Sequence, residues 1–122
     1  MNIQIPTSVG DLIDRVTILS IKNARIENFD ATELQEMNGI LSKIPLSNCV
    51  KHHQSILHSI NEEIWEVEDF NRQCERDQEF GEPFIDNARS VYMLNDLRAQ
   101  VKRSINKMSG SALTEYKSYE KY

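Results

Sequence analysis

The chain has 122 residues, of which 39% are hydrophobic and 27% are charged, and its formal net charge is −5. This length and composition are typical of one soluble globular domain, residues 1–122, with a core that needs no disulfides. The acidic balance argues against a nucleic-acid partner, and four glycines and three prolines are too few for the tight turns of an all-β fold.

The sequence predicts no targeting or membrane segment. Residues 1–6 have neither a cationic start nor an apolar run, and no apolar stretch approaches the roughly 20 residues of a membrane span. Cys49 and Cys74 are too few for a disulfide framework. We therefore expect a cytoplasmic protein that does not act at a membrane.

Two helices are predicted in the first third of the chain, after a short extended lead-in that ends at Pro6. Ser8 is a suitable N-cap, and apolar residues at helical spacing predict a helix over 9–27, in which Gly10 lowers the helix propensity. Asp30 and Glu33 have the spacing of a capping box and predict a second helix over 31–44.

Two longer helices follow. Apolar residues from Ile56 to Phe70 predict a helix over 49–78, and Pro83 suits the first turn of a helix that continues to about 108. Residues 111–122 carry three tyrosines and form either a short helix or an irregular tail. The prediction is an all-α antiparallel bundle of about four helices, two of them long, with a tyrosine-containing C-terminal tail.

The two long helices would span about 45 and 39 Å at 1.5 Å per residue. The shorter helices cannot cover this length. Apolar side chains at the projecting ends would then need a partner, so we expect a homodimer.

Helix 49–78 carries a cluster of carboxylates: Glu62, Glu63, Glu66 and Asp69. Glu62, Glu66 and Asp69 share one helical face, where like charges repel. One interpretation is a site for Mg²⁺ or Mn²⁺, which prefer oxygen ligands. The other is a solvated acidic face that pairs with basic residues of the next helix and needs no cofactor.

The next helix and the tail carry the complementary cluster: Asn95, Asp96, Arg98, Lys102 and Lys117. Arg98 and Lys102 are four residues apart and share a face, so they could bind a small anionic ligand that Asn95 orients. The alternative is pairing with the acidic helix. A zinc site from Cys49, His52, His53 and His58 lacks the remaining ligands, and acidic neighbours make Cys74 a poor nucleophile.

The stretch Glu62-Glu63-Ile64-Trp65-Glu66 resembles the E-E-x-x-E pattern of MazG-like all-α nucleoside triphosphate pyrophosphohydrolases. In that family the pattern supplies magnesium ligands, and an E-x-x-D pair on a later helix completes the site. Glu82 and Asp86 stand four apart here instead of three, so the second half of the pattern is missing.

A wider resemblance covers most of the chain. The segments Ser8–Leu19, Arg89–Tyr92 with Asn95–Ala99, and Gly110–Leu113 with Lys117–Tyr119 are similar to a family of small uncharacterised bacterial proteins, a domain of unknown function. That family is associated with surface-polysaccharide and glycosyltransferase neighbourhoods. The resemblance implies that polar positions such as Asp14, Thr17, Asp69 and Glu115 form a shared pocket or a buried network.

The leading interpretation is therefore a cytoplasmic helical binding or interaction module without a cofactor. The alternative is a metal-dependent hydrolase that acts on nucleotides or other phosphate-containing substrates, with Mg²⁺ or Mn²⁺ on the acidic cluster.

Overall fold

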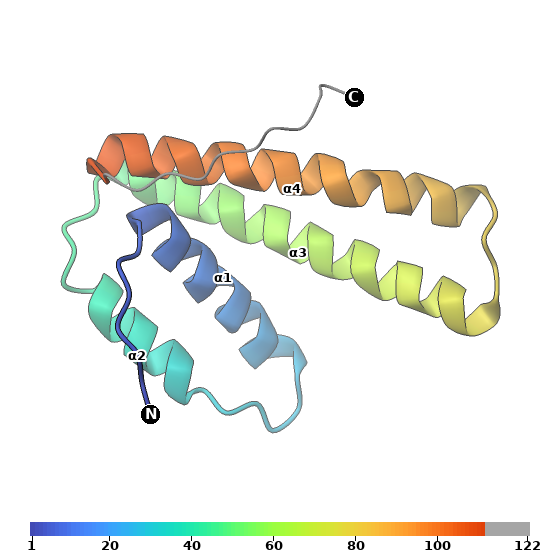
Figure 1. Cartoon of the computed structure of the whole chain (residues 1–122), viewed down its shortest axis with the longest axis horizontal. Coiled ribbons are helices and arrows are strands. Elements are labelled where there is room, and N and C mark those ends of the chain that lie inside the picture. The colour runs from blue at the N-terminus through green and yellow to red at the C-terminus, as the bar shows by residue number, and fades with distance from the viewer. Residues whose placement is uncertain (112–122) are drawn as a thin grey trace.

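The computed structural model describes residues 1–111. It contains four helices, α1 (Val9–Arg25), α2 (Thr32–Leu41), α3 (Asn48–Asp77) and α4 (Glu82–Ser109), and these residues contain no strand. The prediction of an all-α bundle with two long helices is confirmed (Figure 1). The predicted tyrosine-containing tail falls on residues 112–122, outside the described residues.

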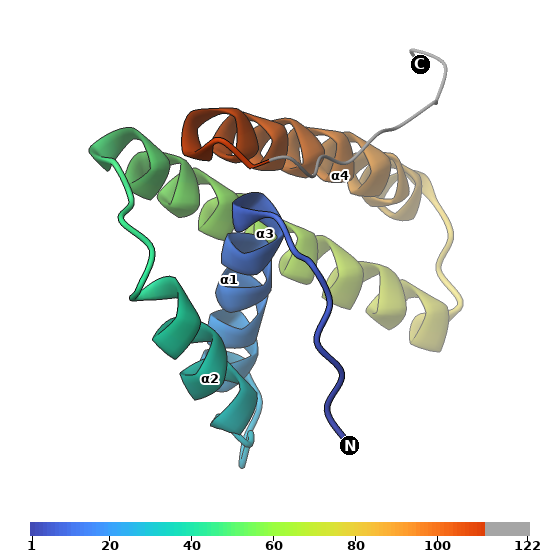
Figure 2. The same ribbon diagram turned by 60° about the vertical axis from the view of Figure 1, so that its left-hand side comes forward.

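The two long helices form an antiparallel hairpin, and the two short helices cover only part of it. A connection of four residues, 78–81, joins α3 to α4, and the two helices pack against each other and separate toward this connection (Figure 1). Helix α1 packs against α3, α4 and α2, whereas α2 packs against α1 (Figure 2). We call the half of the hairpin next to the connection, residues 62–97, the distal hairpin.

The core lies where α1 crosses the other half of the hairpin. Ile13 of α1, Leu57 of α3 and Ile105 of α4 have no exposed surface, and Leu34 and Leu41 attach α2 to the same cluster. Burying each of these side chains contributes roughly 1.5–3 kcal/mol. The helices are therefore held together mainly at the end where α1 lies.

The helix starts follow the sequence with one exception. Ser8 and Ser47 accept hydrogen bonds from Asp11 N and Val50 N, as N-caps do. The predicted capping box of Asp30 and Glu33 is wrong, because the N-cap position of α2 is Ala31, which makes no side-chain cap bond. Glu33 instead pairs with Arg15 of α1, a partner that the local sequence does not indicate.

Asp30 accepts two hydrogen bonds, from the Thr32 hydroxyl at 2.6 Å and from Thr32 N at 3.0 Å. These bonds, that of the hydroxyl first, hold the pKa of the Asp30 carboxyl below its ordinary value of 3.8. Because the pKa is lower in the folded state, the ionised Asp30 stabilises the fold at pH values above 3.8. This contribution to stability is lost as the pH falls through the pKa of the folded state. We expect Thr32→Ala to raise the Asp30 pKa, measured by NMR titration of the carboxyl carbon. Thr7→Ala, in the lead-in, is the control that should leave it unchanged.

Candidate functional site

A buried carboxylate lies at the point where α1, α3 and α4 meet. Asp14 is 5% exposed, and Arg98 of α4 donates to both of its oxygens, from Nε to Oδ1 at 2.9 Å and from Nη2 to Oδ2 at 2.5 Å. This two-bond geometry is the strongest form of a carboxylate–guanidinium pair. Asp14 therefore fixes the position of α4 against α1.

Helix α3 joins this pair through Asn61. Its Nδ2 donates to Asp14 Oδ1 at 2.9 Å and to Thr17 Oγ1 at 2.8 Å, and the Thr17 hydroxyl donates to the Asp14 carbonyl at 2.7 Å. Asn61 was not predicted from the sequence. Its signal is an asparagine within the apolar stripe of α3, four residues after Leu57 and three before Ile64.

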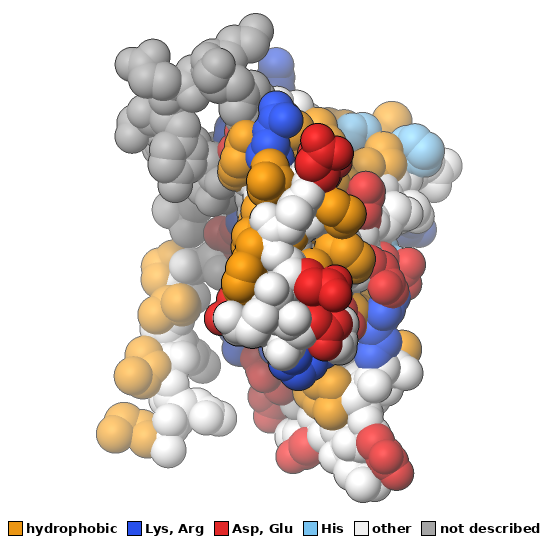
Figure 3. Space-filling view, turned by 90° about the vertical axis from the view of Figure 1, so that its right-hand side faces the viewer, with side chains coloured by type: hydrophobic (Ala, Val, Ile, Leu, Met, Phe, Trp, Pro, Cys, Tyr) orange, Lys and Arg blue, Asp and Glu red, His pale blue; other side chains and the backbone are white. Residues whose placement is uncertain are grey.

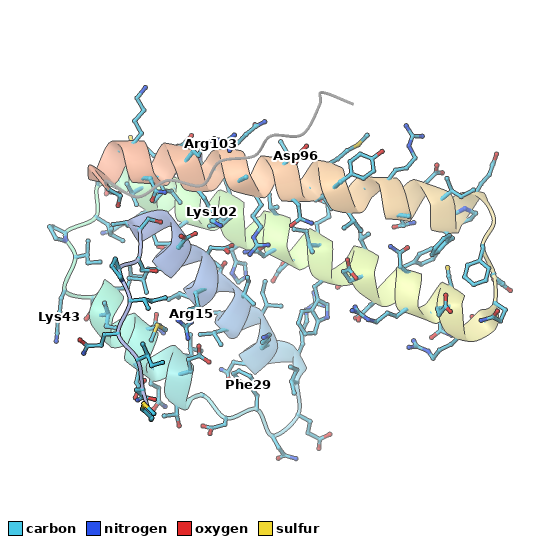
Figure 4. All side chains as sticks on the ribbon, in the orientation of Figure 1. Arg15, Phe29, Lys43, Asp96, Lys102 and Arg103 are labelled. Carbon is cyan, nitrogen blue, oxygen red and sulfur yellow. The ribbon has the colours of Figure 1, made fainter. Side chains whose placement is uncertain are left out.

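Lys102 completes the group. Its Nζ lies 2.9 Å from Asp11 Oδ1 and 4.0 Å from Asp14 Oδ2, and the residue is 9% exposed. Figure 4 shows Lys102 between α4 and α1. We name this group the polar junction: Asp11, Asp14, Thr17, Asn61, Arg98 and Lys102. Its two carboxylates balance its two cations, which is the condition for charges to be tolerated inside a protein.

The backbones of α1 and α4 approach closely at Gly10, and this approach brings the two sides of the polar junction together. A Cβ on Gly10 would lie 2.7 Å from both Asn106 Oδ1 and the Lys102 carbonyl oxygen. Without that atom, α1 comes near enough to α4 for Gly10 N to donate to Asn106 Oδ1 at 2.7 Å. The first turn of α1 therefore rests on α4, and Asp11 and Asp14 reach Lys102 and Arg98.

The side chains that surround the predicted anion site differ from those expected. Arg98 and Lys102 do converge, but on the aspartates of α1. Asn95 accepts from Arg98 Nη1 at 3.3 Å and donates to the Val91 carbonyl, so it belongs to the edge of the polar junction. Asp96 lies on the opposite side of α4 from Lys102 (Figure 4). Lys117 lies outside the described residues.

The predicted metal ligands are arranged along the outside of α3. Glu62 pairs with His58 at 3.1 Å and Glu66 pairs with Arg25 of α1 at 2.5 Å. Glu63, Glu66 and Asp69 border a wide, shallow depression. Within residues 1–111, no three His, Cys, Asp or Glu side chains lie close enough together to hold a metal ion.

The acidic residues of α3 were also expected to pair with the basic residues of α4. In the described residues, the ion pairs of Arg98 and Lys102 run to α1, and Glu66 also pairs with α1. Chemically, the polar junction orients three helices. Donors from α3 and α4 occupy both oxygens of Asp14.

Comparison with known proteins gives a family and no activity. None of the described helices has the combination of length and apolar composition that a membrane span requires. No curated protein and no solved structure matches the chain. A family model described as a family of unknown function, DUF6165, matches residues 1–122. The chain therefore belongs to the DUF6165 family, whose function is unknown.

Proposed function

We propose that the protein is a cytoplasmic interaction module that pairs with a second copy of itself through its distal hairpin. The observation that carries this proposal is the position of α1, which covers the other half of the hairpin and reaches only the beginning of the distal hairpin on α3, near Trp65 and Glu66 (Figures 1 and 2). Among the described helices, α3 and α4 have only each other beyond the end of α1. Two helices alone bury little of their apolar surface, and helices in proteins depend on such packing.

Apolar side chains remain accessible on the distal hairpin. Phe70, Phe80, Ile85 and Leu97 are between 41% and 50% exposed. Phe80 packs edge-on against Phe84 near the connection, with ring centroids 5.2 Å apart. Several large apolar side chains on one projecting part of a molecule are typical of a protein-binding surface.

The charge distribution favours a second copy that lies antiparallel. Residues 62–86 hold ten acidic and two basic residues, a net charge of −8. Figure 3 shows acidic side chains around hydrophobic ones at this end. Residues 49–61 of α3 and 98–109 of α4 hold no acidic residue and five basic ones. A parallel pair would place acidic ends together, whereas an antiparallel pair with two-fold symmetry places each acidic end against the basic half of its partner.

Arg103 and Lys107 are suited to this contact because both are exposed, and Arg103 lies on the side of α4 away from α1 (Figure 4). We expect Arg103→Glu with Lys107→Glu to weaken the dimer by about tenfold to a hundredfold, since each charge counts twice in a symmetric pair. Sedimentation velocity over a range of protein and salt concentrations measures this effect. Raised salt should weaken the wild-type dimer.

Matched variants sharpen the test. Lys43→Glu makes the same kind of charge reversal in the connection between α2 and α3, far from the distal hairpin. This variant should leave the dimer intact. Glu79→Lys with Glu82→Lys should also weaken it, and mixing the two charge-reversed proteins should restore pairing. A wild-type protein that stays monomeric at every concentration would contradict the proposal, as would a dimer that is insensitive to Arg103 and Lys107.

The cytoplasmic location is part of the proposal. Cys49 is exposed and Cys74 is buried, and both are free thiols. Free cysteines suit a reducing compartment. The interaction function needs no cofactor.

Two other predictions have less support. A small anion on Asn95, Arg98 and Lys102 would compete with the aspartates that already pair with these cations. A magnesium-dependent hydrolase would need Glu62 and Glu66 to leave His58 and Arg25. A rise in melting temperature with Mg²⁺ or Mn²⁺ that Glu63→Gln abolishes would favour the hydrolase.

A further inference from the structure

A cavity of about 270 Å³ lies beside the polar junction, where the C-terminal half of α1 diverges from α3. Its lining includes the apolar side chains of Ile18 and Ile21 from α1 and of Ile64 and Trp65 from α3, together with the polar residues Asn61 and Arg98. A concave, mainly apolar site with a few polar groups is the usual form of a small-molecule site.

One acceptor of a side chain that lines the cavity has no donor among residues 1–111. Both hydrogens of Asn61 Nδ2 are used by Asp14 and Thr17, and the carboxylate of Asp14 can only accept, which fixes the orientation of the amide. No residue among 1–111 donates to Asn61 Oδ1, although the residue is only 6% exposed. The fully enclosed side-chain atoms without a partner in this range are Asn71 Oδ1 and Ser109 Oγ. Asn61 Oδ1 is therefore not fully enclosed, and Asn61 is one of the residues that line the cavity.

The charges around the cavity do not select a charged ligand. Five charged side chains border it: Lys22, Glu68, Asp69, Arg72 and Arg98. Arg98 pairs with Asp14, and Arg72 lies 3.3 Å from Glu68. Lys22 and Asp69 are the two that remain, and their charges are opposite. An uncharged molecule avoids the cost of removing an ion from water.

We infer that this cavity binds a small uncharged molecule that consists of a flat apolar ring with one O–H or N–H donor. The ring lies among the isoleucines and Trp65, and the donor hydrogen-bonds to Asn61 Oδ1. The volume limits the ligand to one ring or two fused rings. The residues that line the cavity all belong to one copy of the chain, so the ligand needs no residue of a second copy.

Phenol and anisole form a matched pair of probes, because anisole has the same ring but no donor. Trp65 is the only tryptophan, so its indole N–H gives a single, readily assigned NMR signal. We expect phenol to shift this signal in a saturable way. Anisole should bind at least about tenfold more weakly, because it leaves a buried acceptor unpaired. Equal affinity for the two probes, or no saturable shift with phenol, would overturn the inference.

A variant that fills the cavity provides a second measurement. Ile18→Phe should abolish the phenol-induced shift, whereas Ile40→Phe, the same change at an exposed position of α2, should preserve it. Thermal melting checks that both variants fold. A folded Ile18→Phe protein that still binds phenol as the wild type does would contradict the inference. If Ile18→Phe does not fold, the comparison of phenol with anisole decides by itself.

Discussion

Asp14→Ala is expected to lower the free energy of unfolding by about 3 kcal/mol. The change removes the carboxylate but leaves Arg98 and Lys102, whose side chains are only 28% and 11% exposed, without their shared partner. Partial access to water at Arg98 keeps the expected loss at the lower end of the range for broken buried pairs. Urea unfolding followed by circular dichroism measures it, and the melting temperature should fall by roughly 10 °C.

Two comparisons show whether the loss comes from the buried pair. Asp11→Ala removes a carboxylate that also contacts Lys102 but is 50% exposed, and it should cost about 1 kcal/mol or less. Asp14→Leu with Arg98→Met removes both charges, and it should cost less than the sum of the two single changes. If Asp14→Ala costs no more than Asp11→Ala, the polar junction does not hold the helices in place.

Gly10→Ala should destabilise the protein by about 2–3 kcal/mol, although alanine is the better helix former. The new Cβ would lie 2.7 Å from the Lys102 carbonyl oxygen, and a backbone atom inside a helix cannot move aside alone. Helix α1 must shift away from α4, which lengthens the bond from Gly10 N to Asn106 Oδ1. Chemical denaturation gives the loss in stability, and NMR shows the displaced amide signals of α1.

Gly39 is the matched control for this change. A Cβ on Gly39, within α2, would meet no atom within 4 Å. Gly39→Ala should therefore stabilise the protein by about 0.5–1 kcal/mol through helix propensity alone. Opposite signs at the two glycines are expected, and a stabilising effect at Gly10 would mean that α1 and α4 are farther apart than described.

The helices were predictable from the sequence because the signals for a helix are local. Apolar residues three and four apart predicted each helix, and Ser8 and Pro83 marked two of the starts within a residue or so of the observed ones. The capping box at Asp30 failed because Glu33 has a partner on α1, 18 residues away in the sequence. Competition from another helix is outside what a local pattern contains.

The candidate site was predictable only in part. Arg98 and Lys102 were predicted to share a face, and the carboxylates beside them in the described residues belong to α1 and not to α3. In an antiparallel hairpin, residues equally distant from the connection lie at the same level. Lys102 is 20 residues after Glu82 and is therefore level with Leu57, 20 residues before Asp77, where α3 has no carboxylate.

By itself, the sequence determined the four helices, the absence of strands in the described residues and the separation of charge along the hairpin, because each depends on residues near one another in the chain. Only the tertiary structure decided that Asp14 is the centre of the polar junction, since its partners Asn61 and Arg98 are 47 and 84 residues away. The tertiary structure also decided that Gly10 lies against α4, where a Cβ would have no room. The reason is that α1 lies across both long helices at one end, and no local pattern specifies where one helix crosses another.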